Sequence, residues 1–273
     1  MRRHDFLREL HRRLRPRNYL EIGVNDGKSL ALSRAPSIGV DPEFWVTKPI
    51  QCDVQLVKAT SDAFFERPDP IRHLRSGRNP LRNARRGRPL FDHWRGGTTL
   101  DFAFIDGMHL YEFALRDFMN IERFSRASTV IVLDDMLPRS VPEGSRGGNP
   151  VAWAGDVYKV QLALREHRPD LLLLPVDTEP TGTMVVLGAD PSNDTLSQRY
   201  DAIIEQFAGE DPQSVPDDIL QRTAAYDPER LLELDLWSWL AGAHHGRGAR
   251  AVARVREALP PPTGGRHGAP IEA

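Results

Sequence analysis

Cysteine, long apolar runs and an excess of charge of one sign are all scarce in this 273-residue sequence. Cys52 is the only cysteine, which excludes an internal disulfide and fits a reducing environment. No apolar stretch is long enough to span a bilayer, and the basic residues 1–18 lack the continuous apolar core of a secretory signal. The formal net charge of −2 gives no reason to expect nucleic acid or a membrane surface as a partner. We therefore expect a cytoplasmic protein that binds neither.

The stretch from Leu100 to Asp135 contains the clearest pattern in the sequence. Two short apolar runs, 102–105 and 130–133, flank a segment whose apolar residues recur at helical spacing, which predicts a strand, a helix and a strand. Short apolar strands alternating with helices are typical of a parallel sheet that is buried on both faces. In such sheets ligands bind beyond the carboxyl ends of the strands.

Similar patterns run through residues 1–190. Apolar runs predict seven strands, at 18–23, 37–40, 53–59, 102–105, 130–133, 171–175 and 183–187, the last two as an antiparallel hairpin. Periodicity and capping residues predict further helices at 5–15, 28–34, 60–65 and 157–167. The expected fold is therefore α/β, a Rossmann-like three-layer sandwich around a seven-stranded, mostly parallel sheet.

The remaining segments differ in composition from this domain. Residues 66–98 are rich in arginine and proline, and we interpret them as an inserted loop that is either solvated or a basic lid over an acidic substrate. Residues 191–243 predict a helical extension, whose leucines and tryptophans must be covered by the domain or by a second subunit in a homo-oligomer. Glycine, proline, alanine and arginine dominate residues 244–273, which favours disorder there.

A glycine-containing turn follows the first predicted strand. Gly23 and Gly27 allow a tight turn and close approach of a ligand to the backbone, and Asp41 at the end of the second strand is placed to accept hydrogen bonds from ribose hydroxyls. The middle glycine of a dinucleotide fingerprint is replaced by Asn25. With Glu21 before the turn, the spacing instead resembles motif I of the class I S-adenosylmethionine (SAM)-dependent methyltransferases.

This resemblance implies SAM as cofactor and a set of residues that contact it. They are Glu21, Gly23, Gly27 and Asp41, together with Asp106 at the end of the fourth strand. Ser61 and Asp62 cap a short helix, and the corresponding turn in that family lies beside the adenine, so both are further cofactor-binding candidates.

Several acids and one histidine follow two neighbouring strands. Asp106 and His109 come after the fourth strand, and Asp134 and Asp135 end the fifth. Carboxylates at a buried sheet edge are costly unless they are paired, which suggests a cation or a catalytic task. With Tyr111 and Glu112, these residues resemble the macrocin O-methyltransferase-like group and the related cephalosporin-hydroxylase-like proteins. That resemblance implies that Asp106, Asp134 and Asp135 bind Mg²⁺ and that His109 is the catalytic base.

The chemistry is consistent with this assignment. Mg²⁺ prefers carboxylate oxygens and makes a bound hydroxyl more acidic, so that a nearby imidazole can take its proton. One objection concerns Asp134 and Asp135, because adjacent strand residues point to opposite faces and can share one ion only if the strand ends between them. The alternative for His109 is a capping or core histidine.

The sequence thus predicts a SAM-dependent, Mg²⁺-assisted O-methyltransferase of a small hydroxylated molecule, favouring a sugar-containing natural product. Three alternatives remain open. They are a metal-independent O- or N-methyltransferase, a nucleotide-dependent oxidoreductase, and a SAM-binding module without turnover.

Overall fold

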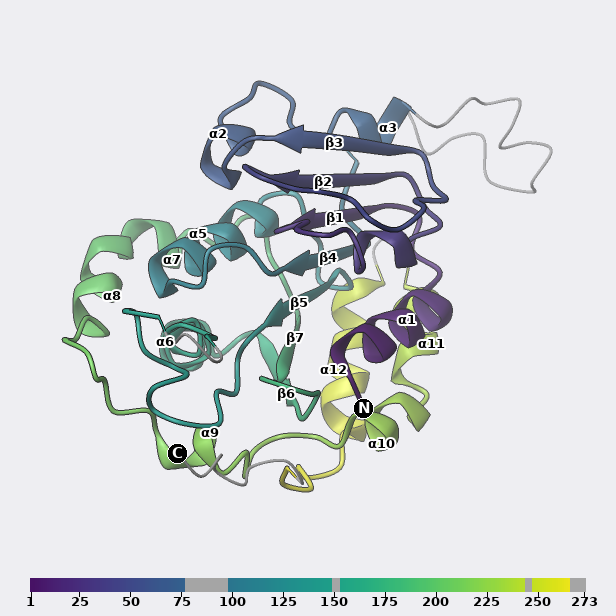
Figure 1. Ribbon diagram of the computed structural model, residues 1–273. Coiled ribbons are helices and arrows are strands. Elements are labelled where there is room, and N and C mark those ends of the chain that lie inside the picture. Colours follow the sequence, from purple (N-terminus) through teal and green to yellow (C-terminus); the bar gives the residue numbers. More distant parts are fainter. Residues whose placement is uncertain (77–97, 149–152, 244–246, 266–273) are drawn as a thin grey trace.

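A single seven-stranded sheet forms the centre of the structure. The computed structural model describes residues 1–76, 98–148, 153–243 and 247–265, and Figure 1 shows their arrangement. The strand order is β3-β2-β1-β4-β5-β7-β6. The bounds are β1 Tyr19–Ile22, β2 Ser37–Asp41, β3 Val54–Lys58, β4 Phe102–Ile105, β5 Val130–Asp134, β6 Leu172–Val176 and β7 Thr183–Leu187. Only β7 runs antiparallel to its neighbours, which confirms the predicted mostly parallel α/β sheet and its terminal hairpin.

Both faces of the sheet are buried, and the strands supply apolar side chains to each in alternation. In β4, Phe102 and Phe104 pack into one core, and Ala103 and Ile105 pack into the other. This alternation explains why the strand runs are apolar throughout rather than at every second position.

One face is covered by helices from the middle of the chain. These are α2 Ser61–Phe65, α3 His73–Ser76, α5 Tyr111–Glu122, α6 Lys159–His167, α7 Thr195–Gln198 and α8 Tyr200–Gln206. The predicted apolar stripe of α5 is buried at Ala114, Phe118 and Ile121. α5 follows β4 directly and α2 follows β3, so both helices begin near the carboxyl edge of the sheet.

The other face is covered by the two ends of the chain (Figure 1). The elements are α1 Arg3–Leu14, the short 3₁₀ helix η1 Leu30–Leu32, α10 Pro228–Glu233, α11 Leu236–Ala241 and α12 Gly248–Ala258, while α9 Asp217–Leu220 lies at the side. Trp237 of α11 is buried and packs edge-on against Phe6 of α1, with ring centroids 6.5 Å apart. The apolar residues that suggested a homo-oligomer are therefore covered within the chain.

The structure corrects several predicted helices. Residues 28–34 form only η1, because the turn at residues 23–27 uses the chain that a longer helix would need before β2. The expected disordered tail is wrong for residues 248–258, which form α12 and bury Ala251, Val252 and Val255. The helical extension predicted at 191–243 consists of five short helices, α7 to α11.

Most of the arginine-rich insertion at 66–98 lies outside the described residues. No helix in the described parts of the chain combines the length and the hydropathy that a membrane crossing requires.

Candidate active site

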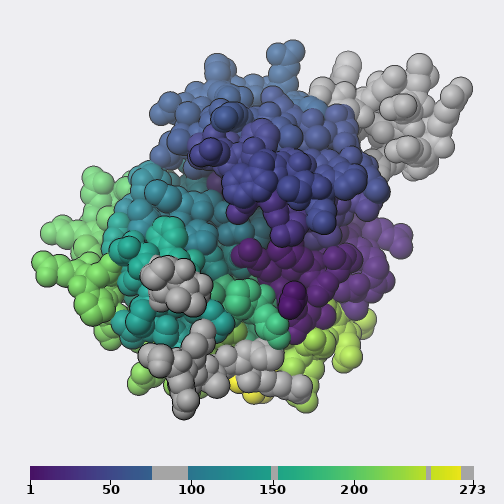
Figure 2. All heavy atoms as spheres, in the orientation of Figure 1, coloured from purple at the N-terminus to yellow at the C-terminus, as the bar shows by residue number. Residues whose placement is uncertain are grey.

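A cavity of about 470 Å³ lies over the carboxyl ends of β1 to β4. In Figure 2 the surface is hollowed between the blue segment that carries β2 and β3 and the teal segment that carries α5. A volume in this range suits a ligand of the size of a nucleoside cofactor. Among the residues that line the cavity are Arg3, Gly23, Asn25, Asp41, Trp45, Ser61, Asp62, Asp106, Met108, His109, Phe113 and Asp117.

The turn after β1 brings the backbone against the neighbouring strand end. Gly23 has a φ of +86°, and a Cβ at this position would lie 1.7 Å from the carbonyl oxygen of Asp106. No side chain fits there, so glycine is required. Asn25 also has a positive φ, and its N–H donates to Asp41 Oδ2 at 2.8 Å. Asp41 therefore orders the turn and also lines the cavity.

The structure divides the predicted cofactor-binding residues into two groups. Gly23, Asp41, Ser61, Asp62 and Asp106 line the cavity.

Glu21 and Gly27 do not line the cavity. Glu21 is completely buried within β1, where its carboxylate accepts hydrogen bonds from Tyr19 Oη at 2.7 Å and Ser29 Oγ at 2.6 Å. Burial raises the pKa of Glu21 to about 8 despite these two hydrogen bonds. Gly27 faces the side chain of Val46 and serves the turn. The prediction that these two residues contact the cofactor is not supported by their positions.

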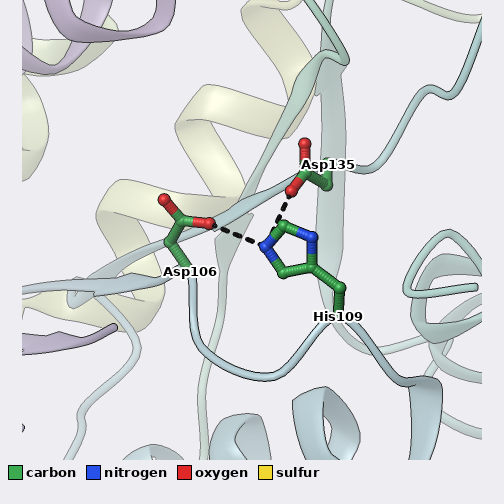
Figure 3. Close-up of side chains that lie close together, drawn as sticks. All are labelled: Asp106, His109 and Asp135. Carbon is green, nitrogen blue, oxygen red and sulfur yellow. Dashed lines mark ion pairs between the residues drawn. The ribbon is translucent and has the colours of Figure 1, made fainter. Parts of the chain in front are cut away.

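Asp106, His109 and Asp135 converge on one point (Figure 3). His109 Nε2 lies 3.4 Å from Asp106 Oδ1 and 3.1 Å from Asp135 Oδ2. The other ring nitrogen, Nδ1, lies 3.1 Å from the carbonyl oxygen of Trp153. Because a carbonyl only accepts, Nδ1 carries a proton, and Nε2 is the nitrogen that faces the carboxylates.

The charges around His109 control its protonation. Burial by itself lowers the pKa of His109, but the hydrogen bond to Asp106 and the charge of Asp135 raise it to about 9. Burial raises the pKa of Asp135 to about 6, although the positive charge of His109 opposes this. Thr181 Oγ1 donates to Asp135 Oδ1, which fixes the orientation of that carboxylate.

Asp134 does not belong to this cluster. It is the last residue of β5, and its Oδ2 contacts Nη1 of Arg3, which also lies 3.4 Å from Asp106 Oδ2. Asp135 follows with a φ of +60°, so the chain turns between the two acids and their side chains diverge. Of the metal set predicted from sequence, Asp106, Asp134 and Asp135, the structure thus brings Asp106 and Asp135 together beside His109 and places Asp134 against Arg3.

The cluster is suited to a divalent cation by its donor atoms. Asp106, His109 and Asp135 each offer one ligand atom, and these atoms lie within 4.8 Å of one another. Two carboxylates suit Mg²⁺ or Mn²⁺, and an imidazole suits the later transition metals better than Mg²⁺.

Backbone contacts hold the histidine in place. At Gly155, with a φ of +65°, a Cβ would lie 1.7 Å from the carbonyl oxygen of His109. Asp156 is fully buried; its Oδ1 accepts the N–H of Tyr111 at the start of α5, and its Oδ2 accepts from Arg146 at 2.8 Å. The sequence placed Asp156 at the start of the next helix, so its role at α5 was missed.

Two more residues of the cavity were missed. Arg3 carries no signal that separates it from the other arginines of the basic N-terminal stretch. Asp117 does carry one, because it falls on the apolar stripe of α5 beside Phe118 and one turn before Ile121. A carboxylate at a core-facing position is a signal that could have found it.

Three large apolar side chains of the cavity and its surroundings remain exposed. Trp45 is 60% exposed and Met108 52% exposed, and both line the cavity. Trp153 is 37% exposed, and its ring centroid lies 5.2 Å from that of His109. These three residues, which we call the rim, are the exposed large hydrophobic residues of the described chain.

Comparison with known proteins places these features in context. Residues 20–136 match a protein family described as a methyltransferase domain, whereas no curated protein matches the chain. Among solved structures, the chain is 18% identical to the O-methyltransferase TomG from Streptomyces achromogenes, involved in tomaymycin synthesis and solved with SAM; the match covers 68% of this chain and 79% of TomG, with a TM-score of 0.44.

A second structure gives a similar result. An O-methyltransferase from Bacillus cereus, solved with S-adenosylhomocysteine (SAH), is 15% identical over 68% of this chain and 80% of its own, with a TM-score of 0.39. Identities and scores this low do not carry the substrates or chemistry of those enzymes to this chain. The family match does cover the turn after β1, Asp41, Asp106, His109 and Asp135. The segment that matches this methyltransferase-domain family, 20–136, thus holds most of the residues that line the cavity.

Proposed function

We propose that this protein is a SAM-dependent O-methyltransferase that acts on a hydroxyl group of a small molecule, in a branch similar to the macrocin O-methyltransferases. The observation that carries the proposal is the position of His109. Its imidazole is oriented by two carboxylates in the wall of a nucleoside-sized cavity at the carboxyl edge of a methyltransferase domain.

The cavity can place the cofactor with its methyl group near His109. Asp41 at the end of β2 is positioned for the ribose hydroxyls, and Gly23 lets the cofactor approach the backbone between β1 and β4. Asp106 and His109 lie at the end of β4, two strands away from Asp41 in the sheet order. Cofactor and acceptor would therefore meet beside the histidine, which is the arrangement that a direct transfer needs.

In the transfer, the acceptor oxygen attacks the methyl carbon of SAM, and the carbon–sulfur bond breaks with its electron pair going to sulfur. His109 Nε2 takes the hydroxyl proton, while Nδ1 keeps its own proton and donates it in a hydrogen bond to the Trp153 carbonyl oxygen, which keeps the ring oriented. A divalent cation held by Asp106 and Asp135 would neutralise the two carboxylates beside His109 and make the acceptor hydroxyl more acidic. The proton then leaves His109 to solvent, since the imidazole is partly exposed.

The rim supports an acceptor with an extended apolar or sugar face. Trp45, Met108 and Trp153 would otherwise remain exposed to water without a partner, and aromatic side chains bind such faces well. A sugar-containing natural product fits this description. The basic-lid hypothesis for an acidic acceptor concerns residues 66–98 and stays a prediction.

Calorimetry and mass spectrometry test the proposal. We expect the protein to bind SAH and not NAD, and to transfer one methyl group from SAM to members of a panel of glycosylated acceptors. Binding of NAD without SAH would instead indicate the oxidoreductase.

Chelation tests the metal separately. We expect chelator to abolish transfer, added Mg²⁺ or Mn²⁺ to restore it, and SAH binding to survive, because Asp41 and the turn after β1 are separate from the cluster. Asp135→Asn should lose metal-dependent activity. Full activity in chelator would favour the metal-independent methyltransferase, in which His109 acts with its carboxylates alone.

A further inference from the structure

The wall of the cavity contains a buried carboxylate that the proposed transfer does not use. Asp117 of α5 is 2% exposed and lines the cavity. Within the described residues, its Oδ1 has no hydrogen-bond partner. The cavity reaches this acid past Gly107, where a Cβ would lie only 3.3 Å from Asp117 Oδ2.

An unpaired buried carboxylate oxygen is unfavourable for the protein alone. Burial raises the pKa of Asp117 to about 7, although a hydrogen bond from Ser61 acts in the opposite direction. A ligand that donates a hydrogen bond to this oxygen would remove the cost of burying it unpaired. Asp117 therefore requires a partner inside the cavity.

The neighbouring acid differs from Asp117, because both of its carboxylate oxygens already have a protein partner. Arg116 donates to both carboxylate oxygens of Asp62, from Nε at 3.1 Å and from Nη2 at 2.7 Å. Asp62 and Ser61 were expected beside the adenine from the sequence. Of the two acids in this part of the cavity, Asp117 is thus the one with an oxygen left for a ligand.

The surroundings of Asp117 fit a purine. Phe113 lies one helical turn earlier on α5, so the two side chains share a face of the helix, and both line the cavity. A ring for the flat face of a base and a carboxylate for its edge are the two contacts by which proteins recognise adenine. With the donor methyl group of SAM beside His109 and its ribose beside Asp41, the adenine base would lie at the part of the cavity that Asp117 lines.

We propose that Asp117 reads the base of the cofactor by accepting a hydrogen bond from the 6-amino group of adenine. The inference rests on the proposed function, since it takes the ligand to be SAM. It assigns the specificity for adenine to α5 rather than to Asp62 in the turn after β3.

The test compares two ligands that differ only at this edge of the base. SAH carries the 6-amino group, and S-inosylhomocysteine carries a carbonyl oxygen there, which the Asp117 carboxylate repels. Calorimetry on the full chain at about pH 8, where Asp117 is ionised, should show that the wild type prefers SAH by about 10- to 100-fold. This measurement needs no variant.

Asp117→Asn should reduce that preference to within about 3-fold, because an amide can rotate to donate to the carbonyl oxygen. Asp62→Asn tests the rival acid of the same cavity: loss of the preference in this variant, with its retention in Asp117→Asn, would overturn the assignment. A circular dichroism spectrum and melting curve establish that each variant is folded. A purely structural role for Asp117 would lower the affinity for both ligands equally and leave their ratio unchanged.

The outcomes separate the two proposals. If the wild type binds SAH but does not distinguish it from S-inosylhomocysteine, or if Asp117→Asn keeps the wild-type ratio, then Asp117 does not read the base and the proposed function stands. If the wild type binds neither ligand, the proposed function itself is overturned and this assignment with it.

Discussion

The two edges of the central sheet carry aspartates in opposite states. At the amino edge, Asp101 immediately precedes β4; at the carboxyl edge, Asp106 follows the same strand. One strand thus connects a fully paired acid to a partly paired cluster, and only the four residues of β4 separate Asp101 from Asp106.

Asp101 is surrounded by donors. It accepts hydrogen bonds from the backbone N–H of Arg17 at 2.8 Å and from Arg17 Nε at 3.0 Å, and Arg126 Nη2 contacts its other oxygen. Burial would raise its pKa, but the hydrogen bonds from Arg17 and the charge of Arg126 lower the pKa to about 2. Such an acid stabilises the fold and has no oxygen left for chemistry.

At the carboxyl edge the pKa shifts have the opposite sign. Burial raises the pKa of Asp117 to about 7 and that of Asp135 to about 6. The protein pays for these groups in stability, which is the usual condition of a binding or catalytic site. Both edges carry buried acids. They differ in how completely hydrogen-bond donors and positive charges surround the carboxylates.

The largest effect is expected at the carboxyl edge. His109→Ala should lower kcat by about 10²- to 10⁴-fold, the contribution of a positioned base, while SAH affinity stays near wild type. The melting temperature should fall, because Asp106 and Asp135 lose the cation that faces them. Steady-state kinetics with SAM and calorimetry with SAH measure the two quantities. A variant with unchanged kcat would remove His109 from the chemistry.

The corresponding change at the amino edge should affect stability instead. Asp101→Asn removes charge partners from Arg17 and Arg126 and should lower the free energy of unfolding by about 2–4 kcal/mol, less than a fully buried pair because both arginines are partly exposed. Urea denaturation measures the loss. Asp69→Asn, in an exposed pair with Arg75, is the control and should cost less than about 1 kcal/mol. Equal effects of the two variants would contradict the assignment of Asp101 as a stabilising acid.

Asp41 tests the cofactor end of the cavity. Asp41→Ala should weaken SAH binding by about 1–3 kcal/mol, because it removes a charged acceptor for the ribose and loosens the turn that Asn25 closes. Titration calorimetry gives the affinity, and Glu66→Ala, at an exposed acid that does not line this cavity, is the control. Unchanged affinity in Asp41→Ala would place the ribose elsewhere.

The smallest expected effect is a difference in pH dependence between the edges. The folded-state pKa of Asp101 lies below its unfolded value of 3.8, so its contribution is present above about pH 4 and is lost as pH falls toward 2. The folded-state pKa of Asp117 lies above 3.8, so its ionisation costs stability as pH rises from about 4 through 7.

Asp117→Asn should therefore exceed the wild type in unfolding free energy by about 1–2 kcal/mol at about pH 8, and this advantage should disappear near pH 4. Urea denaturation across this pH range measures both curves. An advantage that does not vary with pH would show that the carboxylate is already paired.

The sequence allowed the sheet to be predicted because each strand is a short apolar run bounded by polar residues. It also identified Asp106, His109 and Asp135 as neighbours, since the carboxyl ends of adjacent parallel strands meet at one edge. The helix α12 was missed because its apolar stripe consists of small residues in a segment rich in glycine and arginine.

The details of the site depend on geometry that no local pattern encodes. β5 ends at Asp134, and Asp135 adopts a left-handed conformation. Asp135 rather than Asp134 therefore faces His109. Arg3, which contacts Asp134, belongs to α1 near the start of the chain and is far from β5 in the sequence. Glu21 is buried inside β1 and does not line the cavity, which its motif position alone does not reveal.

The exposed rim residues are suitable positions at which to change the range of acceptor molecules. Gly23 and Gly155 meet the backbone of Asp106 and His109 so closely that the inner walls cannot be redesigned by substitution. Trp45, Met108 and Trp153, in contrast, are between 37% and 60% exposed. Variants randomised at these three positions alone should therefore mostly fold. A change in the acceptors that they methylate would then come from the site and not from a loss of structure.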